Sequence, residues 1–364
     1  MIEKISLSNF KLFKEKTDFT NLKNINLLTG VNGRGKSSFL QSLLLIKQSL
    51  LITTDVNRLF LNGEFVKLGN SLDIKNQEIP RDTPIIMTYT RDGRETVLIY
   101  QVDESDNQVL ALQGKVDISS TGLDKVQYVS AERIGPRLSY HKSAQGGIVG
   151  ACGEFAVDVL TKAIKKNQVV EDSFVNLISH LFSIDNEDIE RGIGEQVEFW
   201  MTKMFGETKV DVQSVDDANV DILRISALAS HDAKPTNVGF GFSYAFPILV
   251  SGLIAQHGDI LIVENPEAHL HPSAQSVIAK FLAFVSKQGV QVFVESHSEH
   301  ILNAIRVLVK QEIMSNNEVN VMFFDKAYPA YYKSIAIDNK GRMVEWPNSF
   351  FDQAEKDLNI LLDL

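Results

Sequence analysis

The chain has 364 residues, of which 44% are hydrophobic and 23% are charged, a composition typical of a globular protein with two or three compact units. Acidic residues outnumber basic ones by 46 to 36, so the formal net charge of −10 argues against capture of DNA or an anionic membrane by bulk charge, although a local basic face stays open. Its single cysteine, the lack of any apolar run near the ~20 residues that span a bilayer, and an N-terminus unlike a signal peptide predict a cytoplasmic protein without a disulfide framework.

The first 29 residues predict two or three short strands: Ile2–Phe10, Thr17–Leu22 and Asn24–Leu28. Three lysines, Lys11, Lys14 and Lys16, follow the first of them. Lysine commonly guards the exposed edge of a sheet, so a solvated edge is one interpretation. Contact with a nucleotide or a nucleic acid is the alternative.

The next stretch, Gly30–Ser38 (GVNGRGKSS), fits the phosphate-loop pattern G-x-x-x-x-G-K-S. A β-type run precedes it, and apolar residues at helical spacing follow it, which is the context expected of a P-loop rather than of a glycine-rich turn before a surface helix. Glycines let successive backbone N–H groups face an anion, and the start of a helix adds roughly half a positive charge. The predicted ATP-binding residues are Asn32, Gly33, Gly35, Lys36, Ser37 and Ser38.

Within this loop, two side chains have specific predicted roles. Lys36 is expected to reach the β- and γ-phosphates of ATP, and the Ser37 hydroxyl is expected to bind Mg²⁺.

The middle of the chain changes character twice. Alternating segments between residues 84 and 116 predict antiparallel strands, with Arg91–Arg94 as a hairpin-like turn. A strand at Val126–Ser130 leads into a basic loop, in which Arg133 and Arg137 either form a salt-bridged turn or contact phosphate. Residues 154–206 then predict short helices without heptads, before strands at 209–213 and 222–227 and a polar loop at 228–238.

A second group of candidate residues follows a buried strand in Asp259–Glu267 (DILIVENPE). A carboxylate at the end of such a strand can hold a Mg²⁺ shell, so Glu264 is the candidate metal residue beside Ser37. Asn265 stands where ATP-hydrolysing proteins of this design usually place a glutamate. Glu267 is therefore the candidate for orienting water, and capping of the following segment or a salt bridge to it is its alternative role.

The next predicted strand, Val290–Val294, ends beside a histidine. Ser296 and Glu299 fit a capping box, which predicts His297 in the first turn of a helix, where it can contact a γ-phosphate or the attacking water. A capping or packing histidine is the alternative. The candidate catalytic residues are thus Glu264, Glu267 and His297. The nearby pair His269 and His271 lacks a third ligand for zinc, so no zinc site is expected.

Gly239–Ser243 precedes an apolar helix predicted at Ala245–Ala255, in which Pro247 is tolerable if the helix begins near Ser243. The glycines and the helix start predict a second anion-binding terminus. Because the P-loop already supplies one, Gly241 and Ser243 are predicted to close on a nucleotide held by another subunit. A glycine turn before a core helix is the alternative.

In this order, the motifs resemble the ABC-type ATPases of the SMC/RecF/OLD (overcoming lysogenization defect) group, and in particular its stand-alone bacterial members with a short conserved C-terminal extension. The resemblance covers nearly the whole chain. It rests on the segments LSNFKLF (Leu7–Phe13), VNGRGKSSFLQSL (Val31–Leu43), YVSAERIGPR (Tyr128–Arg137), VGFGFSYAFPIL (Val238–Leu249), VENPEAHLHPSAQ (Val263–Gln275), VESHSEHILNAIR (Val294–Arg306) and IDNKGRMVEWPNSFFDQ (Ile337–Gln353).

The resemblance implies an α/β fold: an ABC-type P-loop ATPase head with a mixed or parallel core sheet flanked by helices, an antiparallel β-lobe and a short helical insertion. The predicted domains are an N-terminal ATPase lobe (1–150), the helical insertion (151–208), a C-terminal ATPase lobe (209–320) and a C-terminal extension (321–364). Two such heads would sandwich two ATP molecules with Mg²⁺, as a homodimer or a higher homo-oligomer.

The chain also departs from the group's pattern. The signature element is not L-S-G-G-Q, which argues against a transporter motor, and no Q-loop glutamine is identified. Asn265 puts fast hydrolysis in doubt, and because no second acidic cluster of the D-x-D kind follows His297, no TOPRIM nuclease is expected. We therefore expect a slow ATPase that regulates a separate effector, such as a nuclease or a toxin-like protein, or a nucleic-acid complex, in anti-phage defence or DNA repair. A nucleotide-gated scaffold that does not hydrolyse ATP and a metal-dependent DNA nuclease using Glu264, Glu267 and Glu295 are the alternatives.

Overall fold

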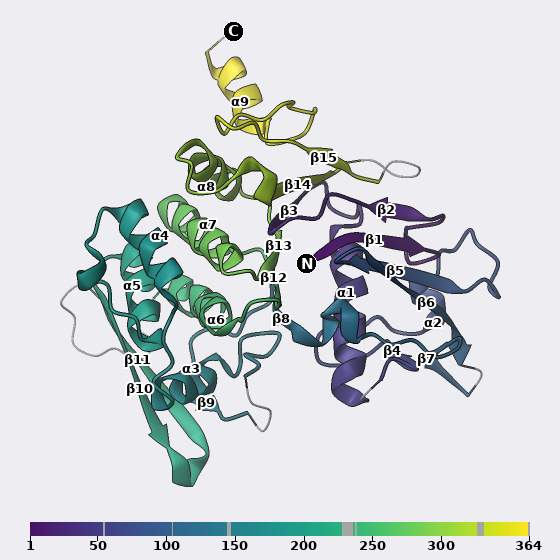
Figure 1. Cartoon of the computed structure of the whole chain (residues 1–364), viewed down its shortest axis with the longest axis horizontal. Helices are drawn as coiled ribbons and strands as arrows, with labels where there is room; N and C mark the ends of the chain where they lie inside the picture. The colour runs from purple at the N-terminus through teal and green to yellow at the C-terminus, as the bar shows by residue number, and fades with distance from the viewer. Residues whose placement is uncertain are drawn as a thin grey trace. The chain divides into compact units, whose positions relative to one another are not determined.

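The computed structural model describes residues 1–53, 55–103, 105–143, 147–227, 236, 239–325 and 331–362 (Figure 1). Its contacts group the chain into two compact units. The central unit consists of Gly122–Met314 together with Met1, and the terminal unit consists of Ile2–Thr121 and Ser315–Leu364. The domain boundaries predicted from the sequence stay a prediction. Across the described residues, no helix combines the length and the apolar character needed to traverse a lipid bilayer.

The terminal unit contains an antiparallel sheet in the order β2-β1-β5-β6-β7-β4. Its strands are β1 (Ile2–Ser8), β2 (Thr17–Phe19), β4 (Arg58–Phe60), β5 (Ile85–Arg91), β6 (Arg94–Asp103) and β7 (Asp106–Leu112). The predicted hairpin turn joins β5 to β6, where Asp92 and Gly93 both have positive φ, at 51° and 71°. A two-residue turn of this kind matches the twist of the strands it connects. The predicted antiparallel β-lobe is therefore confirmed.

The same unit carries the glycine loop between β3 (Ile25–Gly30) and α1 (Lys36–Ile52). β3 pairs in parallel with β14 (Val319–Phe324), which pairs antiparallel with β15 (Lys333–Ile335). Buried aromatic rings, with Phe19 4.7 Å from Phe39 and 6.3 Å from Phe324, fix α1 against these strands. The remaining helices of the unit are α2 (Ser71–Ile74) and α9 (Gln353–Leu361).

The central unit is built on three parallel strands, with β12 (Ile260–Glu264) between β8 (Val126–Val129) and β13 (Gln291–Glu295). The apolar residues of β12 and β13 are fully buried, as expected for strands covered on both faces. In the register of this pair Glu264 lies opposite Glu295, so two carboxylates end neighbouring strands. Helices α7 (Pro272–Lys287) and α8 (Glu299–Lys310) follow these strands.

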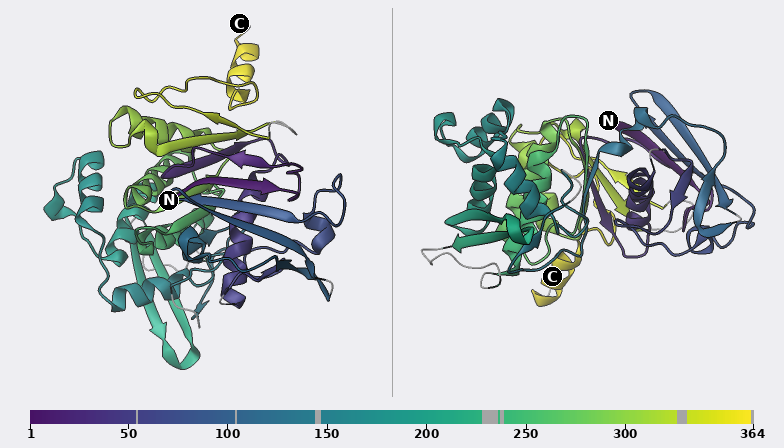
Figure 2. Two further views of the ribbon diagram at one scale, coloured as in Figure 1. Left: turned by 45° about the vertical axis from the view of Figure 1, so that its right-hand side comes forward. Right: turned by 90° about the horizontal axis from the view of Figure 1, so that it is seen from below.

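A helical layer covers α7, comprising α3 (Ala156–Lys165), α4 (Asp172–Phe182), α5 (Ile193–Phe205) and α6 (Phe240–Ile254). Its core is the buried indole of Trp200, packed edge-on against Phe281 and Phe284 at 5.2 and 5.7 Å. A hairpin of β10 (Thr208–Val215) and β11 (Val220–Ala227) extends from this layer, and β9 (Tyr140–His141) pairs with β11 (Figure 2). These elements confirm the α/β class with parallel strands, flanking helices and a short helical insertion.

Two local expectations are wrong. α6 begins at Phe240 instead of near Ser243, so Pro247 lies inside the helix, where its missing N–H leaves out the bond to the Ser243 carbonyl. The ring of Pro247 packs closely against Gly153, which offsets the lost hydrogen bond. A Cβ added to Gly153 would lie 2.5 Å from the Cβ of Pro247. The predicted polar loop preceding α6 lies, apart from residue 236, outside the described residues.

The predicted capping box is also wrong. The N-cap of α8 is Ser298, whose hydroxyl oxygen accepts from the backbone N–H groups of His300 and Ile301 at 3.1 and 3.3 Å. His297 therefore precedes the helix, and Ser296 has a different partner, described below.

Candidate functional site

The glycine loop of the terminal unit has the backbone that its sequence predicts. Gly30, Gly33 and Gly35 have φ angles of 121°, 73° and 109°, a region that favours glycine. A Cβ on Gly30 would lie 2.1 Å from the carbonyl oxygen of Phe324 on β14, while Gly35 caps α1 directly. The loop therefore curls back over the start of α1, as a phosphate cradle requires.

Lys36 is folded into this loop. Its side chain is buried, and its Nζ donates to the carbonyl oxygens of Gly30 and Val31 at 3.0 and 3.1 Å. Asn32, Gly33 and Ser37 are exposed, whereas Ser38 is buried. The ammonium group of Lys36 thus lies inside the curled loop, where it donates to two neutral carbonyl oxygens. A phosphate oxygen can take the place of these carbonyls as its acceptor.

The second group of candidate residues lies at the carboxyl end of the parallel strands of the central unit. Glu264 Oε2 accepts from the backbone N–H of Ala131 at 3.3 Å. Burial raises the pKa of Glu264, and the hydrogen bonds from Ala131 and Tyr128 and the charge of Arg133 oppose that rise. Burial also raises the pKa of the Tyr128 phenol, with Glu264 adding to the effect. The Tyr128 hydroxyl therefore keeps its proton and donates a hydrogen bond to Glu264 at this edge.

Glu267 joins this edge to the loop after β13. Its Oε1 accepts from the backbone N–H of His297 at 2.8 Å, and its Oε2 accepts from the Ser296 hydroxyl at 2.9 Å. This contact differs from the alternative named above, because it holds the loop after β13 and not the segment that follows Glu267. The His297 side chain is exposed. Orientation of water by Glu267 and phosphate contact by His297 stay predictions.

Asn265 is fixed through its backbone. It has a positive φ of 43°, and its N–H donates to the carbonyl oxygen of Glu295 at 2.7 Å. Asparagine tolerates this conformation better than most residues, which is a structural reason for its presence after the strand.

Sequence reasoning missed the role of Arg133, which is 4% exposed. Its Nε donates to the Ser130 carbonyl at 2.9 Å and Nη1 to that of Tyr244 at 3.2 Å. Its Nη2 donates to the Glu264 and Asn265 carbonyls at 2.5 and 2.6 Å. Burial lowers the pKa of Arg133 to about 10, so it stays cationic at neutral pH. The guanidinium thus joins the ends of β8 and β12 to the first turns of α6, a structural role that the sequence did not predict. Phosphate contact by Arg133 stays a prediction.

The start of α6 contains Gly241 and Ser243. A Cβ on Gly241 would come within 2.9 Å of the His269 carbonyl, so only glycine fits this crossing without a shift. Ser243 is 6% exposed, and its hydroxyl has no hydrogen-bond partner in the described part of the chain. Phe240, at the first position of the helix, is 55% exposed.

The structure therefore brings Glu264, Glu267, the backbone of His297 and the start of α6 to one edge of the central unit. The P-loop residues Asn32 to Ser38 gather in the terminal unit. Elsewhere His271 caps α7 by accepting from Ser273 N–H, and His269 packs its ring 4.5 Å from Tyr244. No group of three or more histidine, cysteine, aspartate or glutamate side chains suited to a metal ion occurs among the described residues.

Comparison with protein-family models supports the predicted ATPase for part of the chain. A family model described as "AAA ATPase domain" matches residues 160–302, which include Glu264, Glu267, His297, Gly241 and Ser243. A second model, "Protein of unknown function (DUF3696)", matches residues 314–361. A comparison with curated proteins returned no match.

Solved structures with a similar fold include heads of SMC proteins. The SMC head domain from Thermotoga maritima is 12% identical, with a TM-score of 0.43, and the match covers 93% of this chain and 99% of that one. An SMC head bound to the C-terminal winged-helix domain of ScpA is 12% identical, with a TM-score of 0.49 and coverage of 92% and 98%. The Smc head from Pyrococcus furiosus, bound to the C-terminal domain of ScpA, is 11% identical, with a TM-score of 0.49 and coverage of 100% and 98%.

Proposed function

We propose that this chain is an ABC-type ATPase that binds ATP and Mg²⁺ through Gly30–Ser38, hydrolyses ATP slowly, and dimerises around it. The observation that carries the proposal is the loop itself: three glycines with positive φ before a 17-residue helix, and Lys36 held by loop carbonyls. Backbone N–H groups, a helix start and an ammonium group are the donors that a triphosphate needs.

The residues present fit Mg²⁺ as a companion of ATP. Ser37 offers an exposed hydroxyl at the start of α1, and Glu264 offers a carboxylate at the end of a parallel strand. Bound Mg²⁺ would neutralise phosphate charge. The Tyr128 hydroxyl and the Ala131 N–H hold the carboxylate of Glu264 in one orientation.

In the proposed dimer, Gly241 and Ser243 of one subunit close on the nucleotide bound by the P-loop of the other. The support is the buried Ser243 hydroxyl near the beginning of a long helix, which has no hydrogen-bond partner among the residues that the structure describes. A separate effector protein or a nucleic-acid complex would respond to closure. A role in anti-phage defence or DNA repair rests only on the resemblance of the motifs.

The experiment for the binding proposal is titration of the purified chain with ATP and Mg²⁺ by calorimetry. Lys36→Ala is expected to weaken ATP binding about tenfold or more, corresponding to about 1.4 kcal/mol, because it removes the ammonium group that faces the phosphates. Lys67→Ala, at an exposed lysine of the same unit, is the control and should bind as the unmodified chain does. Equal affinity in Lys36→Ala would contradict the proposal.

A second function is favoured by the contacts of Glu267. Both of its carboxylate oxygens hold the Ser296–His297 loop, which supports a nucleotide-gated scaffold without hydrolysis. Single-turnover hydrolysis separates the two functions: a slower rate in Glu267→Gln favours the ATPase, and an unchanged residual rate favours the gate. The same contacts give no support to a nuclease that would use Glu267 as a metal ligand.

A further inference from the structure

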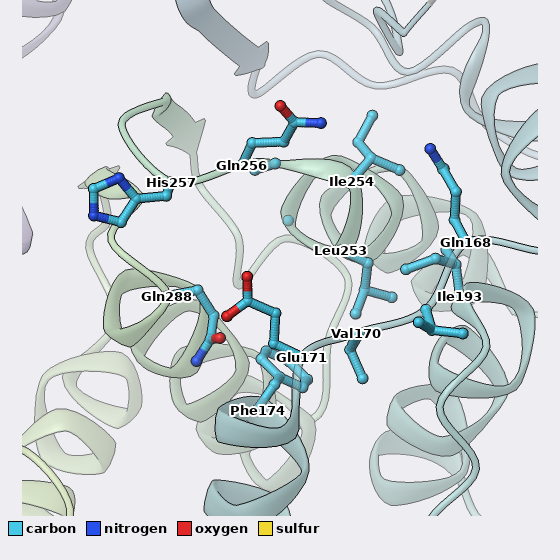
Figure 3. Close-up of a pocket in the computed structure, with 13 residues that line it drawn as sticks. Gln168, Val170, Glu171, Phe174, Ile193, Leu253, Ile254, Gln256, His257 and Gln288 are labelled. Atoms are coloured by element: carbon cyan, nitrogen blue, oxygen red, sulfur yellow. The ribbon is translucent and has the colours of Figure 1, made fainter.

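A cavity of about 440 Å³ opens in the central unit, near the residues that precede β12 and β13 (Figure 3). The loop before β12, which contains His257, and Gln288 before β13 form one side of it, whereas Glu264 ends β12. The other sides are the segment between α3 and α4, the first turns of α4 and α5, and the last turn of α6. The lining residues are Gln168, Val169, Val170, Glu171, Phe174, Ile193, Gly252, Leu253, Ile254, Ala255, Gln256, His257 and Gln288.

The floor of this cavity is apolar. Val170, Phe174 and Ile193 are buried side chains of the helical layer, and Leu253 faces them from α6. At the rim, the side chain of Val169 is 60% exposed. A single exposed valine is common on protein surfaces and does not by itself indicate a binding site. A ligand for this cavity therefore has an apolar portion.

One formal charge lines the cavity. Among the described residues, Glu171 is the only acidic one that lines the cavity, and no lysine or arginine of that set lines it. The carboxylate of Glu171 points toward the centre in Figure 3. α6 and α7 end at the cavity whereas α4 and α5 begin there, so the helix-end partial charges, about half a unit each, largely offset one another. The carboxylate of Glu171 therefore makes the electrostatic potential inside the cavity negative, which favours a cationic ligand.

Amide groups surround that carboxylate. The residues Gln168 and Gln256 are exposed at the rim, so their side-chain amides are accessible to a ligand. An amide offers one acceptor and two donors, which is the complement of a peptide backbone. A cationic group, an aliphatic stem and a peptide bond occur together in a lysine or arginine residue of a protein.

We propose that this cavity docks a lysine- or arginine-bearing segment of a partner protein. The cationic head pairs with Glu171, the aliphatic stem and a neighbouring apolar side chain cover Leu253 and Phe174, and the backbone meets the amides of Gln168 and Gln256. The site is independent of the proposed nucleotide chemistry, because none of its residues belongs to the P-loop or to the Glu264 edge.

The test uses methyl-detected NMR of the full chain, since Val170, Ile193, Leu253 and Ile254 place methyl groups around the cavity. The probes are the blocked peptides acetyl-Leu-Arg-Leu-amide and acetyl-Leu-Gln-Leu-amide, and spermidine. The arginine peptide is expected to shift these methyl signals selectively and to bind about fivefold or more tightly than the glutamine peptide, as expected for one ion pair.

Glu171→Gln should abolish that preference, while Glu187→Gln, at an exposed glutamate outside the cavity, should keep it. Equal binding of both peptides by the unmodified chain, or no cavity shift with either at millimolar concentration, would overturn the proposal. Spermidine binding at least as tightly as the arginine peptide would overturn it too, and would identify a small-molecule polyamine site instead. The methyl spectra of the two variants report whether each remains folded.

Discussion

Arg133 is the single residue on which the geometry of the Glu264 edge most depends. Its guanidinium donates to four backbone carbonyls, from Ser130, Tyr244, Glu264 and Asn265. A side chain without donors removes these charged hydrogen bonds. The Asn265 carbonyl keeps the N–H of Ala268 at 3.1 Å, and each acceptor that is left unpaired in a buried place costs about 1–3 kcal/mol. The packing of α6 against the end of β12 is therefore tied to one side chain.

We predict that Arg133→Met lowers the free energy of unfolding of the central unit by about 3 kcal/mol or more. Arg137→Met, four positions along the same loop at an exposed residue, should change it by less than about 0.5 kcal/mol. Urea unfolding measures both, followed by the fluorescence of the buried Trp200 in chains that also carry Trp346→Phe, so that the signal comes from the central unit. Similar unfolding midpoints for the two variants would show that Arg133 is not the link between these elements.

Glu264 makes stability depend on pH in a direction that follows from its environment. Burial raises its pKa in the folded state, so the folded chain binds this proton more readily than the unfolded chain does. Its ionisation therefore costs stability above the raised pKa, and the cost disappears as the pH falls through that pKa toward the ordinary glutamate value of about 4.3. Any role for Glu264 in holding Mg²⁺ requires the ionised form that the fold disfavours.

We predict that the stability difference between Glu264→Gln and the unmodified chain changes with pH. The amide carries no charge and keeps an oxygen for the Ala131 N–H, so the variant should gain stability relative to the unmodified chain as the pH rises from about 4 to 8. Urea midpoints at several pH values, in the absence of nucleotide and metal, give this difference. A difference that stays constant over the range would mean that the pKa of Glu264 is not raised.

At the scale of elements, two glycines of the same loop differ in why a larger residue would be unfavourable. Both have a strained backbone for other residues, and only one also has a close steric neighbour. Gly30 and Gly33 both have positive φ, at 121° and 73°. A Cβ at Gly30 would come within 2.1 Å of the Phe324 carbonyl oxygen and so would force β3 and β14 apart, whereas nothing lies within 4 Å of the Cβ position at Gly33. The β3–β14 pairing sets where the loop begins.

We predict that Gly33→Ala costs about 1–2 kcal/mol of stability, the usual penalty for a left-handed alanine. Gly30→Ala should cost at least about 2 kcal/mol more, because a strand pair has to move. Thermal unfolding of both variants, with the far-ultraviolet circular dichroism of the terminal unit included in the signal, measures the order. Equal melting temperatures would contradict the close approach of Gly30 to β14.

Patterns with one physical cause were predictable from the sequence at this scale. The apolar runs before Glu264 and Glu295 are strands of a parallel pair because runs of four and three consecutive apolar residues need cover on both faces. The Asp92–Gly93 turn and the glycine loop before α1 follow from residues that accept positive φ.

Features decided by competition between neighbours were not predictable. Ser296 and Ser298 are both good capping residues, and Ser298 caps α8 because Ser296 is engaged by Glu267, 29 positions earlier. α6 starts at Phe240 and includes Gly241, although glycine is a poor helix former. The helix passes so close to the His269 carbonyl oxygen at this position that only glycine fits without a shift. Arg133 and the cavity at Glu171 depend on segments that meet only in the folded chain.

For the whole molecule, the decisive question is whether the beginning of α6 reaches a second copy. A triphosphate carries several negative charges, and one helix start offers roughly half a positive charge, so a second helix start from another subunit adds a comparable attraction. Ser243 is a poor place to test this, because an arginine at a 6% exposed position would disturb the fold of its own unit. Gly239 is better, since its φ is −61° and nothing lies within 4 Å of its Cβ position.

We predict that Gly239→Arg abolishes dimerisation driven by ATP and Mg²⁺ while leaving ATP binding within about twofold of the unmodified chain, because the P-loop of the same copy is unchanged. Light scattering measures the mass with and without nucleotide, and calorimetry measures the binding. Asp217→Arg, on the exposed turn between β10 and β11, adds the same side chain elsewhere and should dimerise normally. If Gly239→Arg gains mass with ATP as the unmodified chain does, α6 does not close on a second copy. If it loses ATP binding as well, α6 acts on the nucleotide of its own chain, and the clasp between subunits has to be abandoned in favour of a site completed within one copy.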